Sequence, residues 1–570
     1  MHMEKSQTGH NLLRGALALL LAIAILCCGI AVPAAVTKAS AASDSLHVMV
    51  MSDPHMLDPG LVGNTKAFKD TTEKNRKMFK ESAAIISAQL QKVKDKKPDV
   101  LLIAGDLSKD GELESHRHLE AELEKLHSQL PNMKIYVTNG NHDINNKNAK
   151  NYNTGGDPKA ATRTSPEAFA SNYSVTYKDK SIIARYTPTS GKAGMLSYVA
   201  RPKKGFTFIV IDSGRYSSDN TDNHTDEHQT SGQITDELRQ WVLNQIESAK
   251  RRGDMVIGME HHNMVPHFSW EPIIRPEFLI NDNTRLCAEY ANAGMHFVFT
   301  GHMHSQDVST FTSSEGNKFY DIETAAGISY PSPMRDCTIS RSMKNGKRVE
   351  TVTGKTIEGE SFTYTDPTVC EQATIKNLKT YGQGKIISRK ATRQMARDYL
   401  SRNMKAAGLK YNSKDYSDKV NSIINGCMDV KVCNDGSKNL YDYVSYAYVH
   451  YLAGEDSQKK PDWFKQAEKR LNDGTLLSNC LYVISGKLKD FDQNKAKIIC
   501  QYLFFPQAMV GRYGLNSANV AGDVLRIPTQ SLDTMSDKDF SNLNQLYYDV
   551  VRSISYDTNF HEDKNFTINV

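Results

Sequence analysis

The sequence predicts an α/β domain followed by a helical region, and three observations support this prediction. In the first part of the chain, short runs of Val, Ile, Leu, Met and Phe lack strict polar alternation, which is typical of strands buried on both faces. From about Thr374, helical patterns replace these runs. At 570 residues the chain also exceeds the size of one hydrophobic core, so at least two domains are expected.

Five predicted strands each end in a short polar cluster. The strands span residues 46–51, 98–104, 134–138, 254–259 and 296–300. The clusters after them are Asp53 with His55, Gly105 with Asp106, Gly140 to Asp143, His261 with His262, and Gly301 to His304. Open α/β sheets place their ligand crevices at the carboxyl ends of strands, so a single site could gather all five clusters.

The residue types in these clusters suit metal ions. Asp, Asn and His offer oxygen and imidazole nitrogen ligands, and no cluster contains Cys, which favours Mn, Fe or Zn over a thiolate site. A carboxylate that bridges two ions about 3.5 to 4 Å apart lets them share a hydroxide and hold a phosphoryl group from both sides. Asp106 is the best candidate for this bridge. The clusters therefore predict a centre of two divalent or trivalent metal ions.

The order of the motifs, D-x-H, G-D, G-N-H-D, H and G-H-x-H, resembles that of the calcineurin-like metallophosphoesterase superfamily. The likeness runs from residue 45 to residue 367. It implies an αββα sandwich, in which two β-sheets pack face to face with helices outside. It also implies one metal held by Asp53, His55, Asp106 and His304, and a second held by Asp106, Asn141, His261 and His302.

By the same resemblance, His142 would face the scissile phosphate. There it would stabilise the transition state or protonate the leaving oxygen, as a positioned general acid does. The family's H-x-P pattern has Asn263 in place of Pro here, so His261 and His262 remain alternatives as the metal ligand. A predicted helix begins after the second cluster, and we expect capping or solvent exposure for the polar residues there: Asp110, Glu112, His116 and His118.

The resemblance also bears on the substrate. Protein Ser/Thr phosphatases of the superfamily carry G-D-x-x-D-R-G, in which the second Asp is the acidic partner of the catalytic His. In this chain Lys109 replaces that Asp, and the Arg that follows it is absent. The motifs are closer to the branch of class III cyclic nucleotide phosphodiesterases and glycerophosphodiesterases. They imply a phosphodiesterase that acts on a small external ester by means of metal-bound hydroxide. A phosphomonoesterase, a nucleotide-sugar pyrophosphatase and a surface binding protein with a vestigial catalytic domain are the alternatives.

Residues 1–41 have the form of a secretory signal peptide. Lys5 and Arg14 precede an apolar stretch at 15–32, and small residues from Ala39 to Ala41 offer a cleavage site. An uncleaved membrane anchor is the alternative. We therefore expect a protein that is secreted or lies on the extracellular face of the envelope. It would then be similar to secreted metallophosphoesterases of Gram-positive bacteria that carry an extra helical domain.

The charge balance bears on the partners. Loss of residues 1–41 removes three cations and one anion, so the formal charge falls from +5 to +3. Such a small, dispersed excess does not indicate a nucleic-acid duplex or an anionic membrane as partner, and a small phosphate ester is the expected one. Two Cys pairs are candidate disulfides, Cys427 with Cys433 and Cys480 with Cys500.

Residues 374–570 are expected to form an all-α domain, whose role no motif assigns. The predicted helices are 389–407, 416–426, 439–452, 461–472, 494–505 and 539–555. In the third of these, four residues recur at helical spacing and favour a buried helix face over a stacking surface for sugars or bases: Tyr441, Val444, Tyr448 and Tyr451.

Overall fold

The computed structural model describes residues 44–215, 230–359, 361–386, 389–455, 458–527, 532, 534–556, 560 and 562–570, so the predicted signal peptide lies outside it. Among these residues, Asp44, Ser45 and residues 340–350 belong to a small unit, and the rest belong to a large unit. The large unit thus contains the predicted site and the described helices. None of the helices in the described ranges combines the length and apolar character that a membrane span requires.

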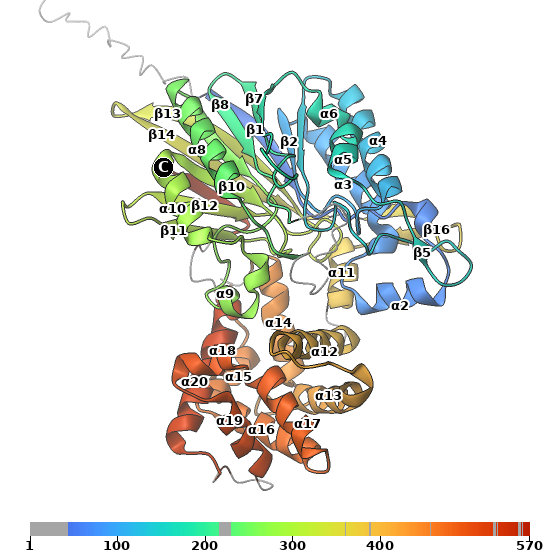
Figure 1. Cartoon of the computed structure of the whole chain (residues 1–570), viewed down its shortest axis with the longest axis vertical. Helices are drawn as coiled ribbons and strands as arrows, with labels where there is room; N and C mark the ends of the chain where they lie inside the picture. The colour runs from blue at the N-terminus through green and yellow to red at the C-terminus, as the bar shows by residue number, and fades with distance from the viewer. Residues whose placement is uncertain are drawn as a thin grey trace, which may run out of the picture. The chain divides into compact units, whose positions relative to one another are not determined.

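Two mixed β-sheets dominate the first part of the chain (Figure 1). The first, in the order β17-β14-β13-β1-β2-β3, consists of Asn565–Asn569, Lys347–Ile357, Met334–Lys344, Asp44–Met51, Val100–Ala104 and Lys134–Thr138. The second, in the order β11-β12-β10-β9-β8-β7-β6, consists of Val308–Thr312, Lys318–Glu323, Met295–Thr300, Met255–Met259, Phe206–Val210, Tyr198–Lys203 and Ile182–Arg185. Strands β1, β2 and β3 run parallel, as do β8, β9, β10 and β12.

The two sheets share one hydrophobic core. Tyr136 of β3 meets Phe208 of β8 with ring centroids 5.8 Å apart. Alternation along β9 places Ile257 in this core, whereas Val256 belongs to a second cluster with Val242 of helix α8. Helices α8 (Asp236–Arg251) and α10 (Asn283–Ala293) thus pack on the second sheet, and α3 (Ser82–Lys96) and α4 (Leu113–Gln129) contribute to the core of the first. The αββα sandwich is confirmed.

The second part of the chain is helical, as predicted. Its helices are α11 (Leu378–Ile386), α12 (Arg389–Ala406), α13 (Ser413–Met428), α14 (Leu440–Leu452), α15 (Asp462–Asn472), α16 (Thr475–Leu488), α17 (Gln493–Ile499), α18 (Gln507–Val510), α19 (Ser517–Arg526) and α20 (Asp537–Ser555). Helix α14 starts at a capping box, in which Asn439 and Asp442 each accept a hydrogen bond from the other's backbone amide.

The buried face of α14 differs from the predicted one. Of the predicted residues only Tyr451 is buried, whereas Val444 is 48% exposed. The buried face is instead formed by Tyr443, Ala447 and Tyr451, which are also spaced by four residues. Because so many residues of this helix are aromatic or apolar, the spacing alone was compatible with more than one face, and the choice made from the sequence was wrong.

The helical region is joined to the α/β part in two ways. Its main hydrophobic cluster includes Met303 and Trp270 from the α/β part together with Leu481 of α16. The chain also returns to the first sheet, because β17 pairs antiparallel with β14. This strand went unpredicted, since only Phe566 and Ile568 alternate within its five residues. The domain boundary near residue 370 stays a prediction.

All seven cysteines in the described residues are free thiols. Neither candidate disulfide is formed: Cys433 donates a hydrogen bond to Asp435 at 2.8 Å, and the thiol of Cys427 is hydrogen-bonded to that of Cys480. The contact therefore joins α13 to α16 and uses one cysteine from each candidate pair.

Candidate metal centre

The five polar clusters converge on one place, as their positions at strand ends predicted. Asp53 and His55 follow β1, Asp106 follows β2, and Asn141 follows β3. The other three predicted ligands follow strands of the second sheet: His261 follows β9, while His302 and His304 follow β10. All seven side chains are buried.

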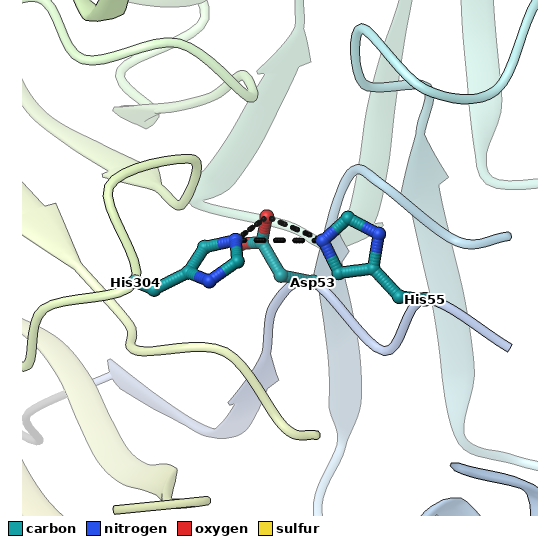
Figure 2. A group of neighbouring side chains, drawn as sticks. All are labelled: Asp53, His55 and His304. Atoms are coloured by element: carbon teal, nitrogen blue, oxygen red, sulfur yellow. Dashed lines mark hydrogen bonds and ion pairs between the residues drawn. The ribbon is translucent and has the colours of Figure 1, made fainter. Parts of the chain in front are cut away.

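The first group of potential metal ligands consists of Asp53, His55 and His304 (Figure 2). Asp53 Oδ1 lies 3.1 Å from His304 Nε2 and 3.7 Å from His55 Nε2. The two Nε2 atoms are 3.4 Å apart. Three potential ligand atoms from two distant parts of the chain therefore point at one another.

The second group consists of Asp106, His261 and His302, with Asn141 beside them. His261 Nε2 lies 3.1 Å from His302 Nδ1 and 3.1 Å from Asn141 Oδ1. It is also 3.4 Å from Asp106 Oδ2, and that same oxygen lies 3.5 Å from His55 Nε2 in the first group. Asp106 thus stands between the two groups, in the position expected of a bridge.

These groups fit metal ions. Asp53 Oδ1, which faces two imidazole nitrogens, is buried without a hydrogen-bond partner. A single proton between two of the three inward atoms would leave the third unsatisfied, whereas a cation can be bound by all of them. The ligand set of imidazole nitrogen and oxygen suits Mn, Fe or Zn.

The ionisation of the carboxylates agrees with a ligand role. Burial alone would raise the pKa of Asp106, but the neighbouring His261, His142 and His55 lower it well below its usual value. Burial likewise opposes charge on His261, yet Asp106 outweighs it and raises the pKa of this imidazole to about 9. Asp106 is therefore an anion throughout the neutral range.

The backbone at the site is strained in the way that functional sites often are. Five of the predicted ligands have a positive φ: Asp53, His55, Asp106, His302 and His304. Non-glycine residues rarely adopt this conformation, because it brings Cβ close to the backbone. Tight turns at the strand ends thus bend the chain so that neighbouring side chains face the centre.

The motif glycines leave room for the ligands. A Cβ on Gly301 would lie 1.9 Å from Ser52 Oγ and 2.4 Å from Asp53 Oδ2, and one on Gly140 would lie 2.2 Å from Asp106 Oδ1. Asp143 then ties two loops together, since its carboxylate accepts hydrogen bonds from the amides of Gly140 and Leu107 at 2.8 Å and 3.0 Å. Such outer contacts orient the ligands.

We expect Gly140→Ala to weaken the site. The new methyl group would displace Asp106, at a cost of about 1–3 kcal/mol for an overpacked position. The measurement is metal content after dialysis, together with the midpoint of thermal unfolding. Gly156→Ala is the matched control, because a Cβ there has no atom within 4 Å. Equal metal content in both variants would contradict this account of Gly140.

His142 lies beside the candidate ligands and is hydrogen-bonded to Asp110, which the sequence analysis did not predict. Its Nδ1 is 2.9 Å from Asp110 Oδ1, while its Nε2 is 3.9 Å from Asp106 Oδ2. Asp110 also accepts a hydrogen bond from the Lys109 ammonium. Burial would raise the pKa of Asp110, but Lys109 and His142 lower it to about 2.

The expectation of capping or solvent exposure was therefore wrong for Asp110 and His116, which are buried. Glu112 is buried as well, but it stands at the N-cap position of α4. The acidic partner of His142 exists and is Asp110, one residue after Lys109. An acidic side chain four residues after Asp106 was the signal available in the sequence. His118 does bind Asp58 near the surface, with Nδ1 2.7 Å from a carboxylate oxygen.

The structure separates the two candidates at the fourth cluster. His261 directs Nε2 at Asp106, and its Nδ1 lies 2.9 Å from the Ala104 carbonyl oxygen. His262 instead has Nδ1 2.8 Å from Ser213 Oγ. Of these two histidines, only His261 belongs to a group of potential metal ligands. The geometry therefore favours His261.

The comparison with protein families agrees with this geometry. Residues 46–306 match the model of the calcineurin-like phosphoesterase family, and this range contains every predicted ligand. Residues 46–306 are a calcineurin-like phosphoesterase domain. The chain is accordingly a metal-dependent phosphoester hydrolase with candidate sites for two metals.

Solved structures show more distant likeness. A dimetal phosphatase from Danio rerio has 14% sequence identity and a TM-score of 0.35, with 58% of this chain and 98% of that chain covered. The phosphopantetheinyl hydrolase from Mycobacterium tuberculosis has 13% identity and a TM-score of 0.24, with 49% and 89% covered. A search of curated proteins found no match.

Proposed function

We propose that this protein is a secreted phosphodiesterase that uses two metal ions to hydrolyse a small ester outside the cytoplasm. The observation that supports this proposal most is the position of Asp106 between two groups of metal ligands, with His142 beside them. Bound metal ions would supply Lewis acidity to the phosphoryl oxygens and lower the pKa of the attacking water.

The residues of the chain would bind the two ions and transfer the proton. Asp53, His55, Asp106 and His304 would hold one ion, and Asp106, Asn141, His261 and His302 the other. His142 would deliver a proton from Nε2 to the leaving oxygen as the ester P–O bond breaks. Asp110 accepts the hydrogen bond from Nδ1 and so fixes which nitrogen faces the substrate.

The preference for a diester and the location rest on the sequence. The segment from Gly105 to Glu112 lacks the Arg of the protein phosphatases, which argues against a phosphoprotein substrate. It is closer to the pattern of cyclic nucleotide phosphodiesterases and glycerophosphodiesterases. The form of residues 1–41 supports export.

A substrate panel tests the proposal. With added Mn, we expect bis(p-nitrophenyl) phosphate, a cyclic nucleotide or a glycerophosphodiester to be cleaved at least ~10-fold faster than p-nitrophenyl phosphate, a difference of one order in rate constant. A nucleotide sugar completes the panel, and Asp106→Asn controls for contaminating hydrolases. A preference for the monoester or the pyrophosphate would support the alternative enzyme. A metal-loaded protein that cleaves nothing would support the binding-protein reading.

A further inference from the structure

Three basic side chains lie around the loop that carries His302 and His304. Arg76 and Lys77 come from the segment between α2 (Lys66–Lys74) and α3, and Arg275 follows the short helix α9 (Glu271–Ile274). We call these three residues the basic cluster. None of them belongs to a motif that the sequence analysis singled out, and the proposed chemistry does not use them.

Arg76 and Lys77 lie on the side of His304. The Arg76 guanidinium donates to the Met303 carbonyl oxygen at 3.5 Å, within the loop between the two histidines. Both cations interact electrostatically with His304, and Lys77 does so with Asp53 and Asp106 as well. Both side chains are partly exposed, so they are not sealed from solvent.

Arg275 lies on the side of His302. Its guanidinium stands 5.5 Å from the centroid of the Phe278 ring, and that ring packs edge-on against His302 with centroids 4.8 Å apart. The Arg275 side chain is 25% exposed. The cluster thus flanks both histidines of one loop.

The helical region contacts Arg76 directly and Arg275 through Glu277. Tyr448 of α14 accepts a hydrogen bond from Arg76. Arg402 of α12 donates to Glu277 at 3.0 Å, and the same Glu277 oxygen lies 3.4 Å from Arg275. Two helices of the second part of the chain therefore position cations beside the centre in the first part.

The charge balance favours an anionic ligand. The carboxylates whose charge acts on Lys77 are chiefly Asp106 and Asp53, which metal ions would neutralise, and Asp110, which is paired with Lys109. Glu277 is shared between Arg275 and Arg402. Once metals are bound, the basic cluster would carry more positive charge than its carboxylate neighbours offset.

We propose that the basic cluster is a subsite for a second anionic group of the substrate, a phosphate or carboxylate carried by one of the two alcohols of the scissile diester. This inference rests on the proposed phosphodiesterase function and narrows its substrate class. A second anion would be held by cations beside the centre while the metal ions hold the scissile group. The helical region is then part of the substrate site, which gives it a role.

Matched substrates test the subsite. We would compare p-nitrophenyl propyl phosphate with its 3-phosphonopropyl and 3-carboxypropyl counterparts. The second anion of the former is a phosphonate, whose P–C bond the enzyme cannot hydrolyse as an ester. We expect one of the charged esters to have kcat/KM at least ~10-fold above the neutral ester, the usual worth of a charge-assisted hydrogen bond. The two charged esters separate phosphate from carboxylate.

Variants assign the effect to the cluster. Lys77→Gln and Arg275→Gln should each remove most of the advantage of the charged ester through KM and leave the neutral ester nearly unchanged. Lys69→Gln is the control, because it loses the same charge from an exposed position on α2. Metal content should be unchanged in all three. Calorimetry measures the same effect without turnover, by comparing the affinity for 3-phosphonopropanoate, which has two anionic groups, with that for propylphosphonate, which has one.

The outcomes separate this inference from the proposed function. Cleavage of all three esters at equal kcat/KM, or equal losses on the neutral and charged esters in both variants, would overturn the subsite while the diesterase stands. No cleavage of any ester, combined with tighter binding of 3-phosphonopropanoate that Lys77→Gln abolishes, would overturn the diesterase and keep the anion site.

Discussion

Asp106→Asn is expected to lose at least one metal ion and ~10³-fold or more of turnover, because a catalytic metal supplies several kcal/mol of transition-state stabilisation. The carboxylate stands between the two ligand groups, with one oxygen 3.5 Å from His55 Nε2 and 3.4 Å from His261 Nε2. A neutral amide cannot bridge two cations as a carboxylate does. Metal analysis by mass spectrometry and kcat on a small diester measure the effect.

The control for this variant is Asp157→Asn, which makes the same change at an exposed loop position. It should keep both metal content and rate. If Asp106→Asn keeps two metals per chain and full turnover, the dinuclear assignment is wrong. A variant that keeps one metal and loses turnover would show that both ions are needed for the chemistry.

The convergence of the candidate residues could be predicted from the sequence because they follow strands directly. Asp53, Asp106 and Asn141 each come within three residues of a strand end, so the parallel order of the strands brings them together. Their chemistry is also local, since Asp, Asn and His have few other reasons to occupy five strand ends in this order. The sandwich fold was implied by the resemblance of these motifs to the metallophosphoesterase superfamily.

The partner of His142 was missed because it depends on the path of a turn. Asp110 and Lys109 are adjacent in sequence, and only the turn after β2 decides which of them faces His142. The loops from β2 and β3 are held together by Asp143, which a reading of separate motifs does not reveal. Spacing predicts which residues lie near the site, but it does not predict the direction of each side chain.

The relation of the helical region to the site could not be predicted either. Its contacts join residues far apart in the sequence, such as Arg76 with Tyr448 and the amide of Gln306 with the Leu452 carbonyl oxygen at 3.0 Å. Met303, between two predicted ligands, packs in the helical region's main cluster. The sequence patterns predicted the helices but not what they pack against, and the structure shows that their main cluster extends to the loop that carries His302 and His304.

His142→Ala should keep both metals and lower turnover by ~10²- to 10⁴-fold on an ester with an alkyl leaving group, the usual range for the loss of a positioned proton donor. The side chain is partly exposed and its Nε2 lies 3.9 Å from Asp106 Oδ2. It could join His55 and Asp106 as a metal ligand, but the family resemblance implies a role on the phosphate instead. The control is His118→Ala, a histidine that binds Asp58 near the surface. Asp110→Asn should give a smaller loss of the same kind.

The leaving group tells the two roles of His142 apart. p-Nitrophenolate leaves as a stable anion and needs little protonation, whereas an alkoxide needs a proton as the P–O bond breaks. If His142 is the acid, His142→Ala should cost much less on bis(p-nitrophenyl) phosphate than on a dialkyl ester. If it stabilises the phosphoryl oxygens instead, the two losses should be equal, because those oxygens are the same in both esters. A variant that loses its metals would show that His142 is a ligand, and neither role would then stand.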